Sequence, residues 1–393
     1  MIMTWNLFEI TLLAWMIFCF ITQLLFHWIV MAKPYHYMQS IAKGGLQNHD
    51  AQPPVSVVIS VKKSNFDLSR FLPAILEQEY PEFEVIVVAD RISDAGEETL
   101  KQLKNSYSNL YFTYVPEDTR NVSRKKLALT LGIKAAKYET LLFTEPDSRI
   151  RSKDWIQLMT RHFSDKKTIV LGFSALENVK SLLHKYIAYD YFVSNLQMIS
   201  LALFNHPYAG NGRNLAYAKS HFIEQKGFVK HRVLQFGEDD LFVNDIATSE
   251  NTAVELSAQS LTLTTIDDFY DWKDQKVNRM STKRFYKRGP VAFWRLESYI
   301  RIGFFAGLIA CLISGFPYTS SRNLLLPGIA FLCLVVWLLS QFIVINKTAE
   351  RLQLEKFYLT IFLFDLFQPF INLYFYFYRI LKAKENYTYR YEK

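Results

Sequence analysis

Long apolar runs near both ends of the chain constrain its fold more than any other feature of the sequence. The first run covers residues 10–30. At about 1.5 Å per residue, a helix of this length crosses the roughly 30 Å apolar core of a bilayer. Two further runs, 302–316 and 324–345, lie close together near the C-terminus. We therefore expect membrane helices at both ends and a non-membrane domain between them.

The charges around the first run predict its orientation. Glu9 is the only charged residue before the run, whereas Lys33 and Lys43 follow it. Positive residues favour the cytoplasmic side, so the middle of the chain is expected in the cytoplasm. No positive stretch precedes the run and no small-residue cleavage site follows it, which indicates an anchor rather than a signal peptide. The expected location is the cell (inner) membrane, with several crossings.

Residues 52–270 have a different pattern, in which short β-branched runs alternate with helical periodicity. Strands are expected at 55–61, 84–89, 110–115 and 140–144, and helices at 68–78, 94–105 and 123–136. Asp67 is a plausible cap of the first helix. Nearly continuous apolar strands that alternate with helices are typical of an α/β fold with a mostly parallel sheet covered on both faces.

A basic and aromatic segment, 271–300, lies directly before the C-terminal apolar runs. The net charge of +8 could serve nucleic acid, anionic lipid or a phosphorylated substrate. No nucleic-acid-binding motif accompanies this segment. We therefore expect an interfacial segment that contacts membrane lipids, and no nucleic-acid partner.

The last apolar segment, 357–382, is ambiguous because it contains Asp365 and Pro369 and precedes a basic tail. A simple crossing would place that tail outside, against the positive-inside rule. A Pro-broken re-entrant or interfacial hairpin is therefore favoured, and a full transmembrane crossing is the alternative. The expected organisation is a transmembrane helix at 1–32, a cytoplasmic domain at 52–270, the interfacial segment at 271–300, two transmembrane helices at 301–346, and this segment at 357–382.

Acidic residues follow two of the expected strands. Asp90 ends the second strand, and Glu145 and Asp147 come directly after the fourth. Ligands of open α/β sheets bind at the carboxyl ends of the strands. Two carboxylates one residue apart suit a hard divalent cation on a diphosphate. The alternative is an ordinary turn at the start of a loop.

Seven short segments, in this order, resemble the motifs of family 2 glycosyltransferases: Pro54-Val-Ser-Val-Val-Ile-Ser-Val61, Gln78-Glu-Tyr-Pro-Glu-Phe-Glu-Val-Ile-Val-Val-Ala-Asp90, Lys125-Lys-Leu-Ala-Leu129, Leu142-Phe-Thr-Glu-Pro-Asp-Ser148, Gly210-Asn-Gly-Arg-Asn-Leu-Ala-Tyr217, Gly237-Glu-Asp-Asp-Leu-Phe242 and Trp272-Lys-Asp-Gln-Lys276. Each segment alone is a weak signal, and their order and spacing over about 53–289 carry the resemblance. It implies the GT-A fold, a Rossmann-like domain that binds a nucleotide sugar.

The resemblance implies a role for each donor-side residue. Asp90 matches the aspartate that contacts the nucleobase, and Lys125 matches a lysine near the donor. Glu145 and Asp147 match the DxD motif, which holds Mg²⁺ or Mn²⁺ on the donor diphosphate. A glutamate replaces the first aspartate here and remains an oxygen ligand for a metal.

Asp239 matches the general base of the family, which takes the proton of the acceptor hydroxyl. Its neighbours Glu238 and Asp240 are further catalytic candidates, and Asp240 is the alternative base. An acid-rich helix start is the structural alternative for all three. The resemblance also implies an acceptor side formed by Gly210, Asn211, Gly212, Asn214, Trp272, Gln275, Lys276 and Arg279.

The family's QxxRW motif is altered, because Asn278 stands where arginine is expected and Arg279 stands where the aromatic residue is expected. That motif is linked to polymer synthesis. The resemblance therefore implies a membrane-bound inverting glycosyltransferase that moves one sugar from a nucleotide-diphosphate sugar, the usual donor being a UDP-sugar, to a lipid-linked glycan or a membrane lipid. A processive enzyme of polysaccharide biosynthesis and a non-catalytic membrane subunit with a degenerate domain are the alternatives.

Overall fold

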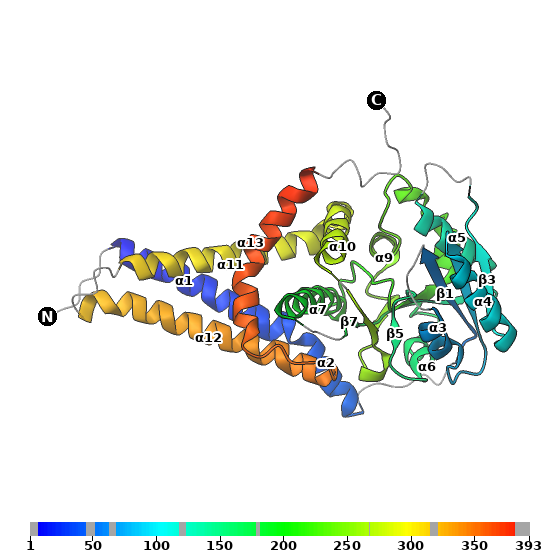
Figure 1. Cartoon of the computed structure of the whole chain (residues 1–393). Coiled ribbons are helices and arrows are strands. Elements are labelled where there is room, and N and C mark those ends of the chain that lie inside the picture. The colour runs from blue at the N-terminus through cyan, green and yellow to red at the C-terminus, as the bar shows by residue number, and fades with distance from the viewer. Residues whose placement is uncertain are drawn as a thin grey trace.

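The computed structural model describes residues 7–44, 52–62, 68–117, 123–177, 181–266, 268–314 and 321–381. Figure 1 shows two parts, an α/β domain and a bundle of long helices that extends from one side of it. Segments from both ends of the sequence lie side by side in the bundle, which places the domain between them along the chain.

The described residues form a seven-stranded sheet with the order β3-β2-β1-β4-β8-β6-β9. Only β8 runs antiparallel to its neighbours. A smaller sheet has the order β5-β10-β7. The expected α/β fold with a mixed, mostly parallel sheet is confirmed. The strands are β1 (Val55–Lys62), β2 (Phe83–Asp90), β3 (Leu110–Tyr114), β4 (Thr140–Phe143), β5 (Arg149–Ile150), β6 (Ile169–Leu171), β7 (Ser174–Leu176), β8 (Leu215–Ala218), β9 (Thr252–Val254) and β10 (Thr262–Thr264).

Helices cover both faces of the large sheet, and alternate residues of each central strand bury on opposite sides. On β1, Val57 and Ile59 join one core, whereas Val58 joins the other. Burial on both faces explains why these strands are apolar at nearly every position. The helices of the domain are α3 (Leu68–Leu76), α4 (Asp94–Ser106), α5 (Arg124–Ala135), α6 (Trp155–Thr160), α7 (Leu182–Leu203), α8 (Lys219–Glu224), α9 (Asp240–Ile246) and α10 (Phe269–Thr282).

The first four strands and three helices predicted for the domain are confirmed, each boundary lying within two residues of the prediction. Local capping fixes some of these starts. The Ser93 hydroxyl accepts a hydrogen bond from the Gly96 N–H at α4, and the Ser123 hydroxyl accepts one from the Lys126 N–H at α5. The predicted cap Asp67 lies outside the described residues.

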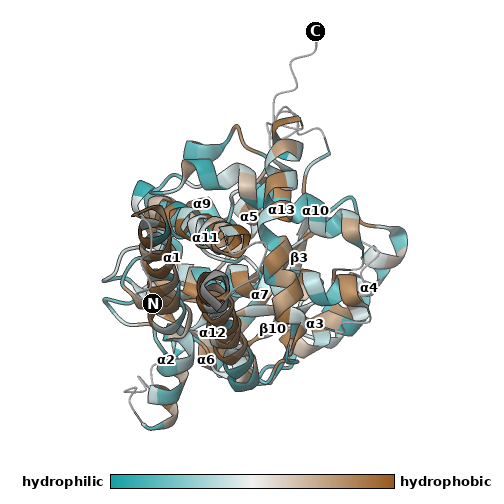
Figure 2. Cartoon of the chain, turned by 90° about the vertical axis from the view of Figure 1, so that its left-hand side faces the viewer, coloured by the Kyte–Doolittle hydropathy of each residue, from teal (hydrophilic) through white to brown (hydrophobic). Residues whose placement is uncertain are grey.

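The bundle consists of α1 (Leu7–Leu25), α11 (Arg288–Ser314) and α12 (Ser321–Arg351). Its core contains Met16, Phe304 and Trp337, one from each helix. A π-helical turn, η1 (Phe26–Met31), joins α1 to α2 (Lys33–Ala42). Figure 2 shows that α1 and α12 consist mostly of hydrophobic residues, whereas α2 is mostly hydrophilic. Together with α13 (Thr360–Leu381), the described residues contain four helices long and apolar enough to cross a membrane, which indicates membrane association.

The expectation of a Pro-broken hairpin near the C-terminus is wrong, because α13 is one continuous helix with Pro369 inside it. Packing on both sides of the proline explains this result. The side chain of Asp365 is buried against Gln341 of α12, and the ring of Phe375 packs edge-on against Trp272 of α10. These contacts offset the roughly 3 kcal/mol cost of an internal proline. Figure 1 shows α13 running crosswise to the bundle where the bundle meets the domain.

The basic and aromatic segment 271–300 divides between two helices. Most of its first part is α10, which packs into the domain through Trp272 and Val277. Its second part is the start of α11, which continues without a break into the bundle. The basic residues therefore lie where the domain ends and the apolar bundle begins.

Candidate active site

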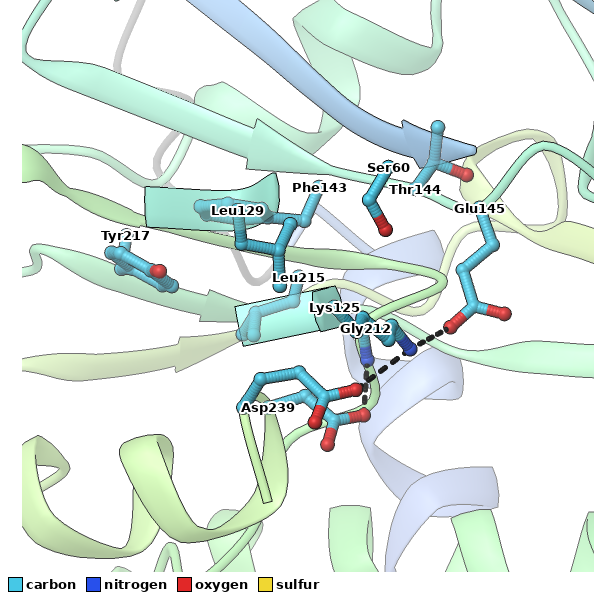
Figure 3. A pocket seen from close by; sticks show the side chains of 11 residues that line it. Ser60, Lys125, Leu129, Phe143, Thr144, Glu145, Gly212, Leu215, Tyr217 and Asp239 are labelled. Atoms are coloured by element: carbon cyan, nitrogen blue, oxygen red, sulfur yellow. Dashed lines mark hydrogen bonds and ion pairs between the residues drawn. The ribbon is translucent and has the colours of Figure 1, made fainter. Parts of the chain in front are cut away.

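A pocket lies at the carboxyl ends of the central strands β1 and β4, the edge where sheets of this kind bind ligands. It holds about 360 Å³ of empty space, part of it open to solvent. Figure 3 shows polar groups from four separate parts of the chain pointing into it. The pocket is lined by Ser60, Lys125, Leu129, Phe143, Thr144, Glu145, Gly212, Leu215, Tyr217, Glu238 and Asp239.

Lys125 connects the two acidic motifs of the pocket. It lies in the first turn of α5, and its Nζ is 2.7 Å from Glu145 Oε1 and 2.7 Å from Glu238 Oε1 (Figure 3). Burial alone would lower the pKa of Lys125, but the two carboxylates outweigh burial and raise it. Residues far apart in the sequence therefore form one charged cluster.

Glu145 and Asp147 share a second cation, the guanidinium of Arg213. Arg213 Nη2 is 2.9 Å from Glu145 Oε2 and 2.9 Å from Asp147 Oδ2. Thr264 Oγ1 also donates to Asp147 Oδ2, at 2.8 Å. Burial alone would raise the pKa of Glu145, but the charges of Arg213 and Lys125 hold it below its usual value.

The chemistry of this acidic pair fits a hard divalent cation. Asp147 is buried, and its Oδ1 has no hydrogen-bond partner among the described residues. Among the residues that the structure describes, no group of three or more His, Cys, Asp or Glu side chains is placed to hold a metal ion. A cation bound to these carboxylates would need further oxygen ligands from a bound ligand or from water.

Asp239 lies on the opposite wall of the pocket from Glu145. It caps α9, where its Oδ1 accepts a hydrogen bond from the Asp240 N–H at 2.7 Å. Its Oδ2 accepts one from the Gly212 N–H at 2.8 Å. A Cβ at position 212 would lie only 3.3 Å from Asp239 Oδ2, so glycine allows this close approach. Two backbone N–H groups thus hold the carboxylate in one orientation.

Asp240 points away from the pocket, into the interior of the domain. Its Oδ2 accepts hydrogen bonds from the hydroxyl of Thr282 and from that of Tyr286, the latter at 2.6 Å. Burial and the neighbouring charge of Asp239 raise the pKa of Asp240. Of the two candidates for the base, Asp239 is the one whose carboxylate lines the pocket.

The turn 210–214 was expected to lie on the acceptor side, and only Gly212 lines the pocket. Gly210 packs against Val243 of α9. Asn214 is fully buried, and its Oδ1 accepts a hydrogen bond from Trp155 Nε1 at 3.0 Å. Asn211 is buried too, and its Nδ2 donates to two polar side chains of α7, Tyr191 and Asn195. The buried asparagines thus hold the shape of the turn.

The α10 residues expected on the acceptor side have divided roles. Trp272 Nε1 donates to Asp190 Oδ2 at 3.1 Å, and Lys276 Nζ lies 2.5 Å from Asp190 Oδ1. Gln275 is half-buried on the same helix. The guanidinium of Arg279 lies 5.2 Å from the ring centre of Tyr191. Its positive charge acts on the site, since it helps to lower the pKa of Glu145.

Asp90 is buried at the end of β2, where Arg124 holds it. Arg124 Nε donates to Asp90 Oδ1 at 2.7 Å, and Nη2 lies 2.6 Å from the same oxygen. Arg124 is the first residue of α5, so the strand end and the helix start are fixed together. The nucleobase contact of Asp90 stays a prediction.

Sequence reasoning missed two residues that organise the site, Arg213 and Asp190. Arg213 is buried within a turn that was noted for its glycines, and nothing in the local pattern separates it from a solvated arginine. Asp190 offered a usable signal, because it is the only acidic residue in the long, largely apolar helix α7. A lone acid in such a helix is expected to have a buried partner.

Comparisons with known proteins support this picture of the fold. A mannosyltransferase from Pyrobaculum calidifontis, PcManGT, solved with GDP-Man and Mn²⁺, is 18% identical, with a TM-score of 0.52 over 87% of this chain and 99% of that chain. TarS 1–349 from S. aureus, solved with UDP-GlcNAc, is 16% identical, with a TM-score of 0.39 over 76% and 82%. No curated protein matches the sequence. The likeness to PcManGT, at 18% identity, shows the fold alone, and the prediction of a GT-A fold is confirmed.

The family model described as glycosyl transferase family 21 matches residues 24–384, which include the α/β domain and most of the long apolar helices. The prediction of a glycosyltransferase from the motifs is therefore confirmed, and the number of the matching family is 21, whereas the motifs suggested family 2. The chain is an enzyme of the glycosyltransferase class, and it belongs to glycosyl transferase family 21.

Proposed function

We propose that this protein is a membrane-bound inverting glycosyltransferase that moves a sugar from a nucleotide-diphosphate sugar to a lipid-linked glycan or a membrane lipid. The observation that carries the proposal is the single pocket in which Asp239, Glu145 and Lys125 meet. A carboxylate that can take a proton lines the same pocket as a cluster that can hold a diphosphate.

In this mechanism, Asp239 accepts the proton of the acceptor hydroxyl while that oxygen attacks the anomeric carbon. The bond to the diphosphate breaks on the opposite face of the sugar, so the configuration inverts. The N–H groups of Gly212 and Asp240 hold the carboxylate in place, which removes the cost of orienting it during the reaction.

The leaving diphosphate lies, in this proposal, beside the positive charges of Lys125, Arg213 and Arg279. Lys125 and Arg279 are held by the protein before the donor binds, so they stabilise the developing charge without rearrangement of solvent. Glu145 and Asp147 would hold Mg²⁺ or Mn²⁺, which neutralises negative charge on the diphosphate. The donor is proposed to be a UDP-sugar, with its nucleobase on the side of Asp90.

The membrane assignment rests on the bundle and on the helix that crosses its base. We infer three crossings, α1, α11 and α12, with the catalytic domain on the cytoplasmic side of the inner membrane. In this arrangement α13 lies along the interface, where its exposed aromatic side chains face lipid headgroups. Those side chains include Phe370, Tyr374, Tyr376 and Phe377. The acceptor reaches the pocket from this interface.

A thermal-shift screen tests the donor assignment. The full chain, purified in detergent, is heated with UDP-sugars and GDP-sugars in the presence of Mn²⁺ or of EDTA. A UDP-sugar with Mn²⁺ is expected to raise the Tm by several degrees, because ligand binding to the native state stabilises it. EDTA is expected to abolish most of that shift. A protein whose Tm responds to no nucleotide sugar would contradict the proposal.

A further inference from the structure

The acidic pair Glu145 and Asp147 is already occupied by a cation of the protein itself. A single nitrogen, Arg213 Nη2, bridges the two carboxylates at 2.9 Å each. The side chains of Arg213 and Asp147 are only 9% and 7% exposed. Charge-assisted hydrogen bonds between buried groups are the strong ones, so the guanidinium holds the position between the carboxylates firmly.

The same contact leaves hydrogen-bonding capacity unused on both sides. Asp147 Oδ1 and Arg213 Nε are buried, and neither has a hydrogen-bond partner among the described residues. Unpaired buried polar atoms cost free energy, and such atoms need a partner. A cation could satisfy the carboxylate oxygen, and an anion could satisfy the guanidinium nitrogen.

We propose that Arg213 is an internal counter-ion of the acidic pair, which a divalent cation displaces and which then pairs with the donor diphosphate. The inference rests on the proposed function, because it assigns the donor and the metal to this pocket. Arg213 is thus a switchable ligand: it contacts the carboxylates when the pocket is empty and the diphosphate when donor and metal are bound.

Electrostatics predicts that the binding of metal and the binding of donor favour each other. A divalent cation that enters without donor must break two buried ion pairs and leave the guanidinium without an anion, which is costly. The donor diphosphate supplies the replacement anion. Metal and donor therefore bind with positive linkage, and each tightens the binding of the other by the same factor. Part of any such linkage comes from direct contact between metal and diphosphate, so the contribution of Arg213 has to be isolated by substitution.

Arg213→Gln isolates that contribution because it removes the charge and keeps a polar side chain. Mn²⁺ binding to the full chain in detergent is measured by electron paramagnetic resonance, with no nucleotide, with UDP and with GDP. Without nucleotide, the variant is expected to bind Mn²⁺ about tenfold more tightly than the wild type, because the carboxylates lose their competing cation. At saturating Mn²⁺, the nucleotide is expected to bind about tenfold more weakly, because the diphosphate loses a charged partner.

Opposite changes in the two affinities separate this role from a structural one, since a damaged pocket would lose both. Arg161→Gln is the matched control, because Arg161 pairs with the buried Glu255 at 2.7 Å and not with Glu145 or Asp147. It should leave both affinities unchanged. Arg213→Lys keeps the positive charge but lacks the planar guanidinium with its several N–H donors. It is expected to change the Mn²⁺ and nucleotide affinities in the same directions as Arg213→Gln, by a smaller factor. Arg213→Lys replaces Arg213→Gln in the experiment if the glutamine variant unfolds below the assay temperature.

The outcomes distinguish this inference from the function on which it rests. If the wild type binds Mn²⁺ with a nucleotide and both Arg213 variants match it, the switch is wrong and the metal assignment stands. If both variants lose Mn²⁺ and nucleotide together, Arg213 only maintains the pocket, and the switch is again wrong. If the wild type binds no Mn²⁺ with either nucleotide, the metal assignment itself fails.

Discussion

Adjacent residues of the same type have opposite surroundings in this protein. Asp239 and Asp240 are the same residue type, and only the family resemblance, not the local run of three acids, favours Asp239 as the base. The start of α9 makes the difference: Asp239 caps the helix at the pocket, whereas Asp240 is buried against Thr282 and Tyr286. Those last two contacts come from residues more than 40 positions away, which local pattern alone does not reveal.

Asp239→Asn tests the assignment of the base. The amide keeps the size of the side chain, but it cannot accept a proton from the acceptor hydroxyl. Turnover is expected to fall by about 10²–10⁴-fold, the usual contribution of a general base. Donor affinity is expected to stay within a few-fold of the wild type, because Asp239 makes no ion pair with Lys125 or Arg213 in the structure.

Asp240→Asn is the matched comparison at the next position. The amide oxygen can accept the hydroxyl hydrogen bonds of Thr282 and Tyr286, and the Leu241 N–H then loses its side-chain acceptor. Because Asp240 does not line the pocket, turnover is expected to fall less than about tenfold. The turnover of both variants is measured as the steady-state rate of nucleoside diphosphate release. A larger loss in Asp240→Asn than in Asp239→Asn would reverse the assignment.

At the scale of helices and strands, the predictable elements are those whose apolar pattern reflects burial in a single sheet. The strands β1, β2 and β4 were predictable because each is buried on both faces, whereas the edge strand β3 is buried only at Leu110. The continuity of α13 was not predictable, because Pro369 suggested a break in the helix. Packing against distant segments keeps the helix continuous. The hydrogen-bond partners of Asp190 of α7 were not predictable for the same reason, because they are distant in the sequence. Asp190 accepts hydrogen bonds from Trp272 of α10 and from Gln368 of α13.

Asp190→Asn tests whether this buried contact between three helices stabilises the protein. The variant leaves the Lys276 ammonium without its charged partner, and the free energy of unfolding is expected to fall by about 3–5 kcal/mol at neutral pH. Burial alone would raise the pKa of Asp190, but the charge of Lys276 outweighs burial and lowers it. A lowered pKa stabilises the fold above the ordinary value of 3.8, and this stabilisation disappears as the pH falls through the lowered pKa.

Thermal melting against pH checks this prediction. The Tm difference between the wild type and Asp190→Asn should be full at pH 7 and should narrow below pH 3.8. Glu97→Gln is the control, because Glu97 forms an exposed pair with Lys101 on α4 and should change the Tm little. Equal Tm values for the wild type and Asp190→Asn at pH 7 would show that the contact adds no stability.

The whole molecule combines a polar pocket, which we propose binds a water-soluble donor, with helices long and apolar enough to cross a membrane. The apolar runs and the ordered motifs were sufficient to predict long apolar helices beside a GT-A domain, since each depends on composition or spacing along the chain. The orientation predicted from the flanking charges stays a prediction. The arrangement of the parts was not predictable. Figure 1 shows α7 between the sheet and the bundle, and α13 across the base of the bundle. These positions depend on contacts between residues far apart in the sequence, such as the hydrogen bond between Tyr186 of α7 and Gln368 of α13, which are 182 residues apart.

The most direct test of the account follows a labelled sugar into lipid. The wild-type chain is reconstituted in bilayer discs made from a bacterial lipid extract and incubated with a panel of radiolabelled nucleotide sugars and Mn²⁺. We predict that label from one donor enters the organic phase as a single-sugar adduct, and that Asp239→Asn discs transfer almost none. Equal transfer by wild type and Asp239→Asn, or no transfer from any donor to lipid or lipid-linked glycan, would contradict the account.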